Sequence, residues 1–246
     1  MITGGSAGIG LAIAETFVNA GNEVIICGRR ESKLAEAKQK LPQLHTRVCD
    51  VSKKQEREEL FQWVTSEFPE INMLINNAGI QKETDFLKGA PELYDGESEI
   101  EINLTGTVHL SALFTPYLLQ QKNECAIVNI TSGLAFIPLK ILPVYCATKA
   151  GLHSFSQSLR SQLAETNIRV FEIAPPNVKT ELHREKKARK QAEKRGVEAS
   201  VVAKATFKAI RKNRFEAAIG EAKSLKGASR IAPRSFHNLL NKLATG

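Results

Sequence analysis

Short, mostly apolar runs alternate with amphipathic stretches along almost the whole of this 246-residue chain. Such runs, without a polar residue at every second position, are typical of strands buried on both faces of a parallel sheet. Six of them stand at residues 23–27, 46–49, 73–75, 126–130, 168–173 and 215–219. Residues 1–3 add a further strand, so short that we expect the natural chain to begin further upstream.

The intervals between the runs predict helices. In the first interval Ile9, Ile13 and Phe17 recur every four residues, and Gly21 supplies a stop. Further helices are expected over residues 31–40, 55–68, 99–121 and 145–165. Because crossovers between parallel strands are right-handed, this alternation predicts an α/β fold: one doubly wound, Rossmann-like sheet of about seven strands with helices on both faces. No linker interrupts the pattern, so we expect a single domain over residues 1–246.

The cysteines limit the kinds of site and the compartment. They are scattered, form no CxxC pair and accompany no histidine cluster, which argues against a structural zinc site and predicts no metal. Free thiols are typical of a reducing, cytoplasmic location. No apolar run reaches the length that spans a membrane, and no secretory signal opens the chain. The four residues are Cys27, Cys49, Cys125 and Cys146.

The charge is unevenly distributed. Residues 1–150 carry a net charge of −4, whereas residues 151–246 carry +12. A basic third of this kind can meet nucleic acid, an anionic membrane or an anionic substrate. No nucleic-acid motif accompanies it, and aromatic residues make up only 6% of the chain, too few for a base-stacking surface. We therefore favour solvated charged helices and expect no nucleic-acid partner.

A glycine-rich turn follows the first strand and opens the first helix. Glycines there permit a tight turn and a close approach of the backbone to a pyrophosphate, which the helix N-terminus favours electrostatically. An ordinary glycine-rich turn is the alternative, but the strand before it and the helix after it favour a dinucleotide site. The candidate contacts are Gly4, Ser6, Gly8, Ile9 and Gly10.

The end of the second strand bears on the choice of dinucleotide. An NAD(H) site usually needs an acidic residue here for the ribose hydroxyls, but Gly28 occupies that position. Arg29 and Arg30 follow and suit a phosphate dianion, although two solvated arginines on a loop are the alternative. The sequence thus favours NADP(H) over NAD(H).

Tyr145 and Lys149 are spaced to share one face of a helix, with Ser132 thirteen residues before the tyrosine. An ammonium fixed near a phenol stabilises the phenolate and lowers the pKa of the phenol, which would let Tyr145 exchange protons near neutral pH. An isolated pair of this kind is equally compatible with a half-buried tyrosine beside a solvated lysine. The other motifs decide between these interpretations.

Together these motifs resemble those of the short-chain dehydrogenase/reductase family. The resemblance rests on Thr3-Gly4-x-x-x-Gly8-x-Gly10, Asn76-Asn77-Ala78-Gly79, Asn103, Ser132 and Tyr145-x-x-x-Lys149, in matching order over about 180 residues. The chain also resembles a bacterial subgroup of oxidoreductases associated with D-alanylation of lipoteichoic acid. The family likeness implies an enzyme that transfers a hydride between NADP(H) and a carbonyl or secondary alcohol.

The resemblance also implies roles for individual residues. Tyr145 would be the general acid or base, Lys149 would lower its pKa and bind the nicotinamide ribose, and Ser132 would hydrogen-bond the substrate oxygen. Asn103 would hold a water relay to the lysine, or alternatively cap a helix or make a polar contact between helices. The adenosine end would involve Asp50, Val51, Asn76, Asn77, Ala78 and Gly79, although Asp50 can also be a helix N-cap and the Asn pair can tie strands together.

One position departs from the family pattern. Where the family usually has Pro-Gly-x-Val-x-Thr, this chain has Pro175-Pro176-Asn177-Val178-Lys179-Thr180. Proline in place of glycine fixes φ near −65° and removes an N–H, so any contact that needs either feature is excluded. Val178 and Thr180 stay as candidate cofactor contacts.

The substrate end is less constrained. Apolar residues flank the segment between Ser132 and Tyr145 and suggest an apolar pocket or plain loop packing: Leu134, Phe136, Ile141, Leu142 and Val144. Residues 181–200, with seven Lys and Arg against four Glu, correspond to a substrate lid; a solvated helix is favoured there over an anionic-substrate site. Residues 221–246 form a basic C-terminal extension.

Two other functions are alternatives to an active reductase. One is a dinucleotide sensor or scaffold without turnover, which would need no proton donor. The other is a polyanion-binding surface on the basic third. The family likeness also makes the helices over 99–121 and 145–166 a pairing surface, so we expect a homodimer or homotetramer with a small-molecule substrate.

Overall fold

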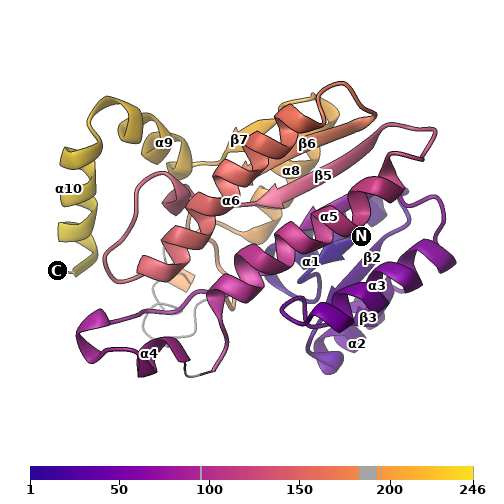
Figure 1. Cartoon of the computed structure of the whole chain (residues 1–246), viewed down its shortest axis with the longest axis horizontal. Helices are drawn as coiled ribbons and strands as arrows, with labels where there is room; N and C mark the ends of the chain where they lie inside the picture. Colours follow the sequence, from indigo (N-terminus) through magenta and orange to yellow (C-terminus); the bar gives the residue numbers. More distant parts are fainter. Residues whose placement is uncertain (95, 183–192, 195, 246) are drawn as a thin grey trace.

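The computed structural model describes residues 1–94, 96–182, 193–194 and 196–245 (Figure 1). Seven parallel strands form one sheet in the order β3-β2-β1-β4-β5-β6-β7, so the predicted doubly wound α/β fold is confirmed. The order reverses direction at β1, where the chain crosses from β3 to β4, and ligands bind outside such a point in open α/β sheets. The strands are β1 Ile2–Thr3, β2 Ile25–Gly28, β3 His45–Val48, β4 Met73–Asn76, β5 Cys125–Ile130, β6 Ile168–Ala174 and β7 Glu216–Ala218.

Helices cover both faces of the sheet. Successive residues of a strand point to opposite faces, so Ile26 packs into one apolar core and its neighbours Ile25 and Cys27 into the other. The first core includes α1, α2 and α8, and the second includes α3, α5 and α6, which lie in front of the sheet in Figure 1. These helices are α1 Gly8–Asn19, α2 Glu31–Lys40, α3 Lys54–Glu67, α5 Gly106–Leu118, α6 Pro143–Gln162 and α8 Ala199–Arg211.

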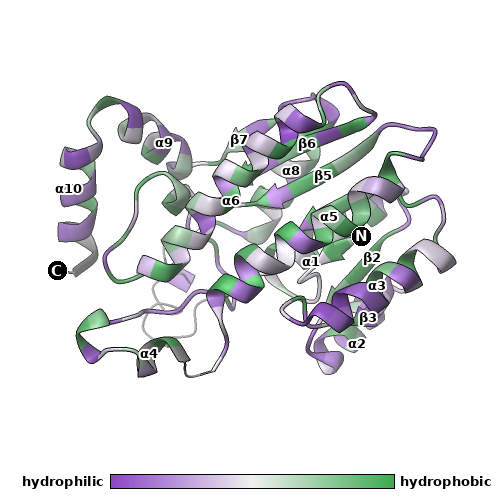
Figure 2. Ribbon diagram, viewed as in Figure 1, coloured by the Kyte–Doolittle hydropathy of each residue, from purple (hydrophilic) through white to green (hydrophobic). Residues whose placement is uncertain are grey.

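The colouring by hydropathy follows this layering. The strands are largely green in Figure 2, whereas α3 and α10 carry purple residues. Within the described residues, no helix is both long enough and apolar enough to cross a lipid bilayer.

The helix expected over residues 99–121 is built differently from the prediction. Ile100–Thr105 form a π-helix, and a regular α-helix begins only at Gly106. A Cβ at Gly106 would lie 2.7 Å from the backbone oxygen of Val51, so the glycine permits this close approach of the two segments. A π-helical turn inside a helix is often found at functional sites. It places Asn103 fully in the interior.

The C-terminal segment, expected only as a basic extension, folds into two helices. Its residues form α9 Glu221–Ile231 and α10 Pro233–Thr245, which stand at one end of the molecule in Figure 1. α9 packs against the short 3-10 helix Gly133–Ala135, where a Cβ on Gly133 would lie 3.0 Å from both Ala222 and Leu225. Asn241 of α10 accepts a hydrogen bond from the Lys140 N–H at 2.6 Å and donates one to Pro138 C=O at 3.2 Å. Both helices therefore hold the loop that carries Ser132.

The segment expected to be a lid falls largely outside the description. Residues 183–192 and 195 are not described, and they include most of its cations: Arg184, Lys186, Lys187, Arg189, Lys190 and Arg195. Between β4 and α5 the chain forms the 3-10 turn Phe86–Lys88 and the short helix α4 Pro91–Tyr94.

Candidate active site

One cleft of about 710 Å³ opens at the carboxyl ends of the strands. Most of the predicted site residues line it, although they come from segments far apart in the sequence. They are Gly4, Ser6, Gly8, Ile9, Arg29, Arg30, Asp50, Val51, Asn77, Ala78, Gly79, Ser132, Tyr145, Lys149, Val178 and Thr180. Of the described candidates, Gly10, Asn76 and Asn103 are not among the residues that line it.

Tyr145, Ser132 and Lys149 come together in the cleft. Tyr145 and Lys149 occupy one face of α6, and each is 4% exposed. Ser132 interacts with the Tyr145 phenol and favours the phenolate. Its Oγ accepts a hydrogen bond from the Leu134 N–H at 3.1 Å. The Lys149 ammonium donates to Ile130 C=O at 2.9 Å. A proton donor, a hydroxyl and a buried cation thus face one space.

Burial governs the acidity of Tyr145 and Lys149. Burial raises the pKa of the phenol above its ordinary value, and the neighbouring Ser132 side chain offsets only part of that effect. Burial also lowers the pKa of Lys149 to about 8. Burial therefore drives both groups toward their neutral forms, and the lowering of the Tyr145 pKa by Lys149 stays a prediction.

Asn103 serves as a tie between elements. Its Oδ1 accepts from the Ile80 N–H at 2.8 Å, and its Nδ2 donates to Ile80 C=O at 2.9 Å and to Thr148 Oγ1 at 3.2 Å. It thereby joins the segment after β4 to α6. A Cβ on Gly79 would lie 3.3 Å from Asn103 Oδ1 and 3.7 Å from Lys149 Nζ, so the two side chains flank the same glycine.

The glycine turn has the backbone that a pyrophosphate cradle requires. Gly4 and Gly8 have φ of 62° and 54°, a region that favours glycine. Gly10 has a different function, because a Cβ there would lie 2.4 Å from Gly4 C=O. It allows α1 to approach the turn closely. The N-terminus of α1 consequently presents its backbone N–H groups to the cleft, and the residues present fit a dinucleotide phosphate.

The asparagine pair after β4 is mainly structural. Asn77 Nδ2 donates to the carbonyls of Thr3 and Gly4 at 2.9 and 3.1 Å, which fixes the glycine turn. Asn76 Nδ2 donates to Asn129 Oδ1 at 2.9 Å and so ties β4 to β5. Asn76 Oδ1 is buried and has no hydrogen-bond partner among the described residues.

The adenosine end contains cations and carboxylates. A Cβ on Gly28 would lie 3.2 Å from Ser6 Oγ, which leaves little room there for the acidic side chain of an NAD(H) site. Arg29 and Arg30 line the cleft, but each forms an ion pair, Arg29 with Glu97 and Arg30 with Glu181. These two glutamates are cleft residues that the sequence did not reveal.

Asp50 does not cap α3, whose N-cap residue is Lys53. Its Oδ1 accepts from the Ser52 N–H at 2.9 Å and from Ser52 Oγ at 2.8 Å, in the turn that precedes α3.

At the other side of the cleft, Pro175 C=O accepts from the Gly133 N–H at 2.9 Å, and Val178 forms an isolated bridge with Val197. The proline-containing segment thus holds Gly133, the residue next to Ser132.

Beyond Ser132 and Tyr145 the wall of the cleft is mostly apolar. Leu134, Ile141 and Leu142 lie there as the apolar-pocket interpretation suggested. Phe136 instead packs edge-on against His153 at 5.0 Å, and Val144 is not part of the described lining. Four further apolar residues complete the wall: Leu139, Leu182, Leu225 and Leu240. Leu225 and Leu240 come from α9 and α10.

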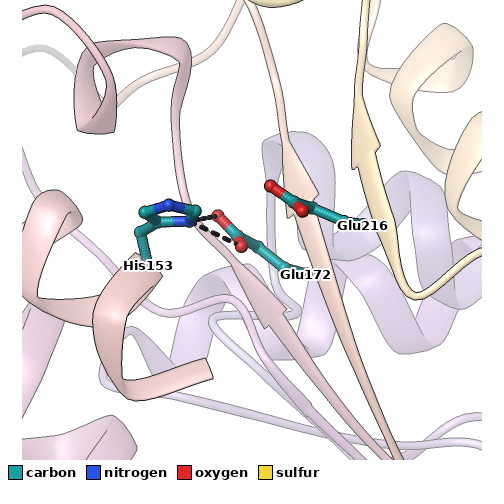
Figure 3. Close-up of side chains that lie close together, drawn as sticks. All are labelled: His153, Glu172 and Glu216. Carbon is teal, nitrogen blue, oxygen red and sulfur yellow. Dashed lines mark hydrogen bonds and ion pairs between the residues drawn. The ribbon is translucent and has the colours of Figure 1, made fainter. Parts of the chain in front are cut away.

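A cluster of ionisable side chains, of which only Glu172 is fully buried, joins α6, β6 and β7 (Figure 3). His153 Nδ1 donates to Glu172, at 2.8 Å from Oε2, and Glu216 lies beside them and pairs with Lys226. Burial raises the pKa of Glu172, partly offset by His153. The ligand atoms of His153, Glu172 and Glu216 lie within 4.8 Å of one another. Because Glu172 is already hydrogen-bonded to His153 and Glu216 is paired with Lys226, the cluster is a structural polar network.

This network also positions the nearby proton-transfer segment. Thr131 Oγ1 donates to Glu172 Oε1 at 2.9 Å, which fixes the residue directly before Ser132. His153 lies two helical turns after Tyr145 on α6.

Comparisons with known proteins agree with this geometry. Residues 1–191 match the short chain dehydrogenase family. The chain is 50% identical over 230 residues to the uncharacterized oxidoreductase DltE of Bacillus subtilis. The aligned region covers 94% of this chain and 91% of that protein. A closed serine dehydrogenase complexed with NADP+ has a TM-score of 0.80 at 28% identity, over 89% and 92% of the two chains. A dehydrogenase of Burkholderia phymatum in complex with NAD has a TM-score of 0.85 at 21% identity, over 97% and 93% of the chains, a likeness of fold alone.

Proposed function

The chain belongs to the short chain dehydrogenase family, and from that premise we propose that it is an NADP(H)-dependent oxidoreductase. It transfers a hydride between nicotinamide and a carbonyl or secondary alcohol substrate. The observation that carries this proposal is that Ser132, the Tyr145 phenol and the Lys149 ammonium line the same cleft, with Tyr145 and Lys149 on one face of α6. A sensor or scaffold would not need a buried proton donor of this kind.

The chain's own residues perform the proton transfer. The bound cofactor supplies or accepts the hydride. Tyr145 donates its phenolic proton to the carbonyl oxygen during reduction and accepts it from the alcohol during oxidation. Ser132 donates a hydrogen bond to the same oxygen and stabilises the charge that develops there. With one donor used by Ile130, Lys149 keeps two further N–H groups for the cleft, and its charge favours the phenolate.

The adenosine end supports NADP(H). Arg29 and Arg30 are the cations of the cleft there, and Gly28 offers no acid to hold ribose hydroxyls. A guanidinium group can donate two parallel hydrogen bonds to the oxygens of one phosphate, whereas a ribose hydroxyl does not offer this arrangement. The similar structures named above hold NADP+ in one case and NAD in the other, so the preference rests on these residues.

A neutral, apolar carbonyl compound fits the substrate end best. Seven Leu and Ile side chains form that wall, and its carboxylates, Glu83 and Glu221, disfavour an anionic group. The cations that suggested an anionic substrate lie mostly in residues 183–192, outside the described part of the chain. The substrate we propose is therefore a ketone or aldehyde with an apolar substituent.

The proposal extends to the state of the protein in the cell. We propose a single-domain, cytoplasmic enzyme, consistent with four free, buried thiols. We also propose a homodimer or homotetramer in which α5 and α6 contribute to the pairing surface. Ile100 and Leu119, at the ends of the helical segment that contains α5, are 52% and 45% exposed. A monomer at micromolar concentration in light scattering would contradict this.

The experiment that tests the function is a substrate panel. NADPH oxidation would be followed with neutral alkyl and aryl ketones, matched carboxylated ketones and aldehydes. Turnover with the neutral members, abolished in Tyr145→Phe, is the expected result. NADPH binding without turnover on any member would support the dinucleotide sensor instead.

A further inference from the structure

The two arginines at the end of β2 are held by two glutamates from distant segments. Arg29 pairs with Glu97, on the segment between β4 and α5. Arg30 pairs with Glu181, on the segment that follows β6, at 2.6 Å. All four residues line the cleft. Each ion pair therefore spans the adenosine end and connects β2 to another wall.

These pairs change the electrostatics of the adenosine end. Two guanidinium groups face two carboxylates, so the charge available to an incoming anion is compensated. The side chains are partly exposed, 35% for both Arg29 and Glu97 and 51% and 46% for Arg30 and Glu181. Exposed pairs of this kind are weak and open readily. A phosphate dianion, with twice the charge of a carboxylate and three acceptor oxygens, is the stronger partner for an arginine.

We propose that Glu97 and Glu181 are selectivity-determining residues that compete with the 2′-phosphate of NADP(H) for Arg29 and Arg30. This inference rests on the proposed NADP(H) function and adds residues to it. Without a 2′-phosphate the carboxylates occupy the arginines, and with it the arginines turn to the phosphate. A cofactor without the 2′-phosphate offers the arginines no competing anion, so both ion pairs stay intact. The glutamates thus lower the affinity for NADP(H) selectively.

Breaking the pairs also affects the walls of the substrate end. Glu181 is followed by Leu182, which lines the cleft and accepts a hydrogen bond from the Gln81 N–H at 3.3 Å. Glu97 C=O accepts from the Lys82 ammonium at 3.5 Å. Residues 81 and 82 therefore meet both glutamate-bearing segments. Displacement of the carboxylates by phosphate removes the Arg29–Glu97 and Arg30–Glu181 links between these segments and the end of β2.

Equilibrium binding tests this competition without any turnover. Glu97→Gln and Glu181→Gln keep the side-chain size and remove the charge. Titration calorimetry would measure NADPH, NADH and 2′,5′-ADP, the last of which carries the 2′-phosphate but no nicotinamide. Each variant should bind NADPH and 2′,5′-ADP about three- to ten-fold more tightly, with NADH changed by less than about two-fold. Glu101→Gln, an exposed residue of the neighbouring π-helix outside the cleft lining, is the matched control.

The background variant Arg29→Ala separates competition from simple charge repulsion. In that background Glu97→Gln should no longer tighten NADPH binding, because the contested arginine is absent. An equal gain there, or a gain no larger than that of Glu101→Gln, overturns the inference. If Arg29→Ala itself weakens NADPH and NADH equally, the phosphate clamp of the proposed function fails as well. A selective loss of NADPH affinity in Arg29→Ala without any effect of the glutamates overturns this inference alone.

Discussion

The Lys149 ammonium lies 5.8 Å from the centroid of the Tyr145 ring, one helical turn along α6. Both side chains are almost fully buried, and burial drives both toward their neutral forms. Since burial favours the neutral forms of both side chains, the pair can transfer a proton only when a ligand in the cleft supplies compensating charge. The geometry is therefore in place before ligands arrive, whereas the acidity of Tyr145 depends on them.

The phenol of Tyr145 should be required for turnover but not for folding. Tyr145→Phe removes the proton donor and its interaction with Ser132. We expect kcat to fall at least about 10²-fold, with NADPH affinity within a few-fold of wild type. The free energy of unfolding should fall by only about 1 kcal/mol. Activity near that of wild type would remove Tyr145 from the mechanism.

The buried ammonium of Lys149 should make stability depend on pH. Its pKa falls from 10.5 to about 8 on burial, so the folded state disfavours the charged form. The stability penalty is complete below pH 8 and disappears as pH rises toward 10.5, where the unfolded chain also loses the proton. Relative to wild type, Lys149→Met should gain a pH-dependent stabilisation of about 3 kcal/mol below pH 8. Denaturant unfolding at pH 7 and pH 10 would measure it, and an equal difference at both pH values would contradict it.

Gly10 should tolerate no side chain. A Cβ there would meet Gly4 C=O at 2.4 Å, a backbone atom that cannot move without distorting the cradle. Gly10→Ala should lower the free energy of unfolding by about 2 kcal/mol or more and weaken NADPH binding. Gly21→Ala is the control, because that glycine has φ of 81° but open space around it. The control should lose about 1 kcal/mol of stability without any change in NADPH affinity.

Leu240 should contribute to substrate affinity from the C-terminal helix. Leu240→Asp places a charge in the apolar wall and should raise KM for a neutral apolar ketone about ten-fold, with kcat changed less. Leu239 precedes it on α10, is 51% exposed and is not part of the described cleft lining. Leu239→Asp should therefore leave KM unchanged. Equal KM values for the two variants would exclude α10 from the substrate end.

Local pattern was enough to predict the strands and the proton-transfer residues. The runs ending at Ile130 and Ile173 are buried on both faces, so they carry the continuous apolar signal of parallel strands. Tyr145 and Lys149 could be predicted to lie on one face because residues four apart share a face in any α-helix. The π-helical start before α5 was not predictable, because it depends on the contact of Gly106 with Val51, which lies far away in sequence.

Long-range pairs account for the other differences. Arg30 meets Glu181 across 151 positions of sequence, so no local signal marked either glutamate as a cleft residue. The raised pKa of Tyr145 could not be predicted from the sequence, because spacing reports the lysine but not the burial of the phenol. The helices α8 to α10 were not assigned, although their apolar and polar side chains separate clearly onto opposite helical faces, a signal that the sequence does carry.

The most direct test of the account is isotope transfer from NADPH deuterated at the nicotinamide C4 position. The protein would be incubated with this cofactor and a neutral apolar ketone, and the product alcohol analysed by mass spectrometry. The account predicts deuterium on the carbinol carbon with the wild-type protein and none with Tyr145→Phe. Tight NADPH binding without transfer of label to any neutral ketone or aldehyde would contradict it.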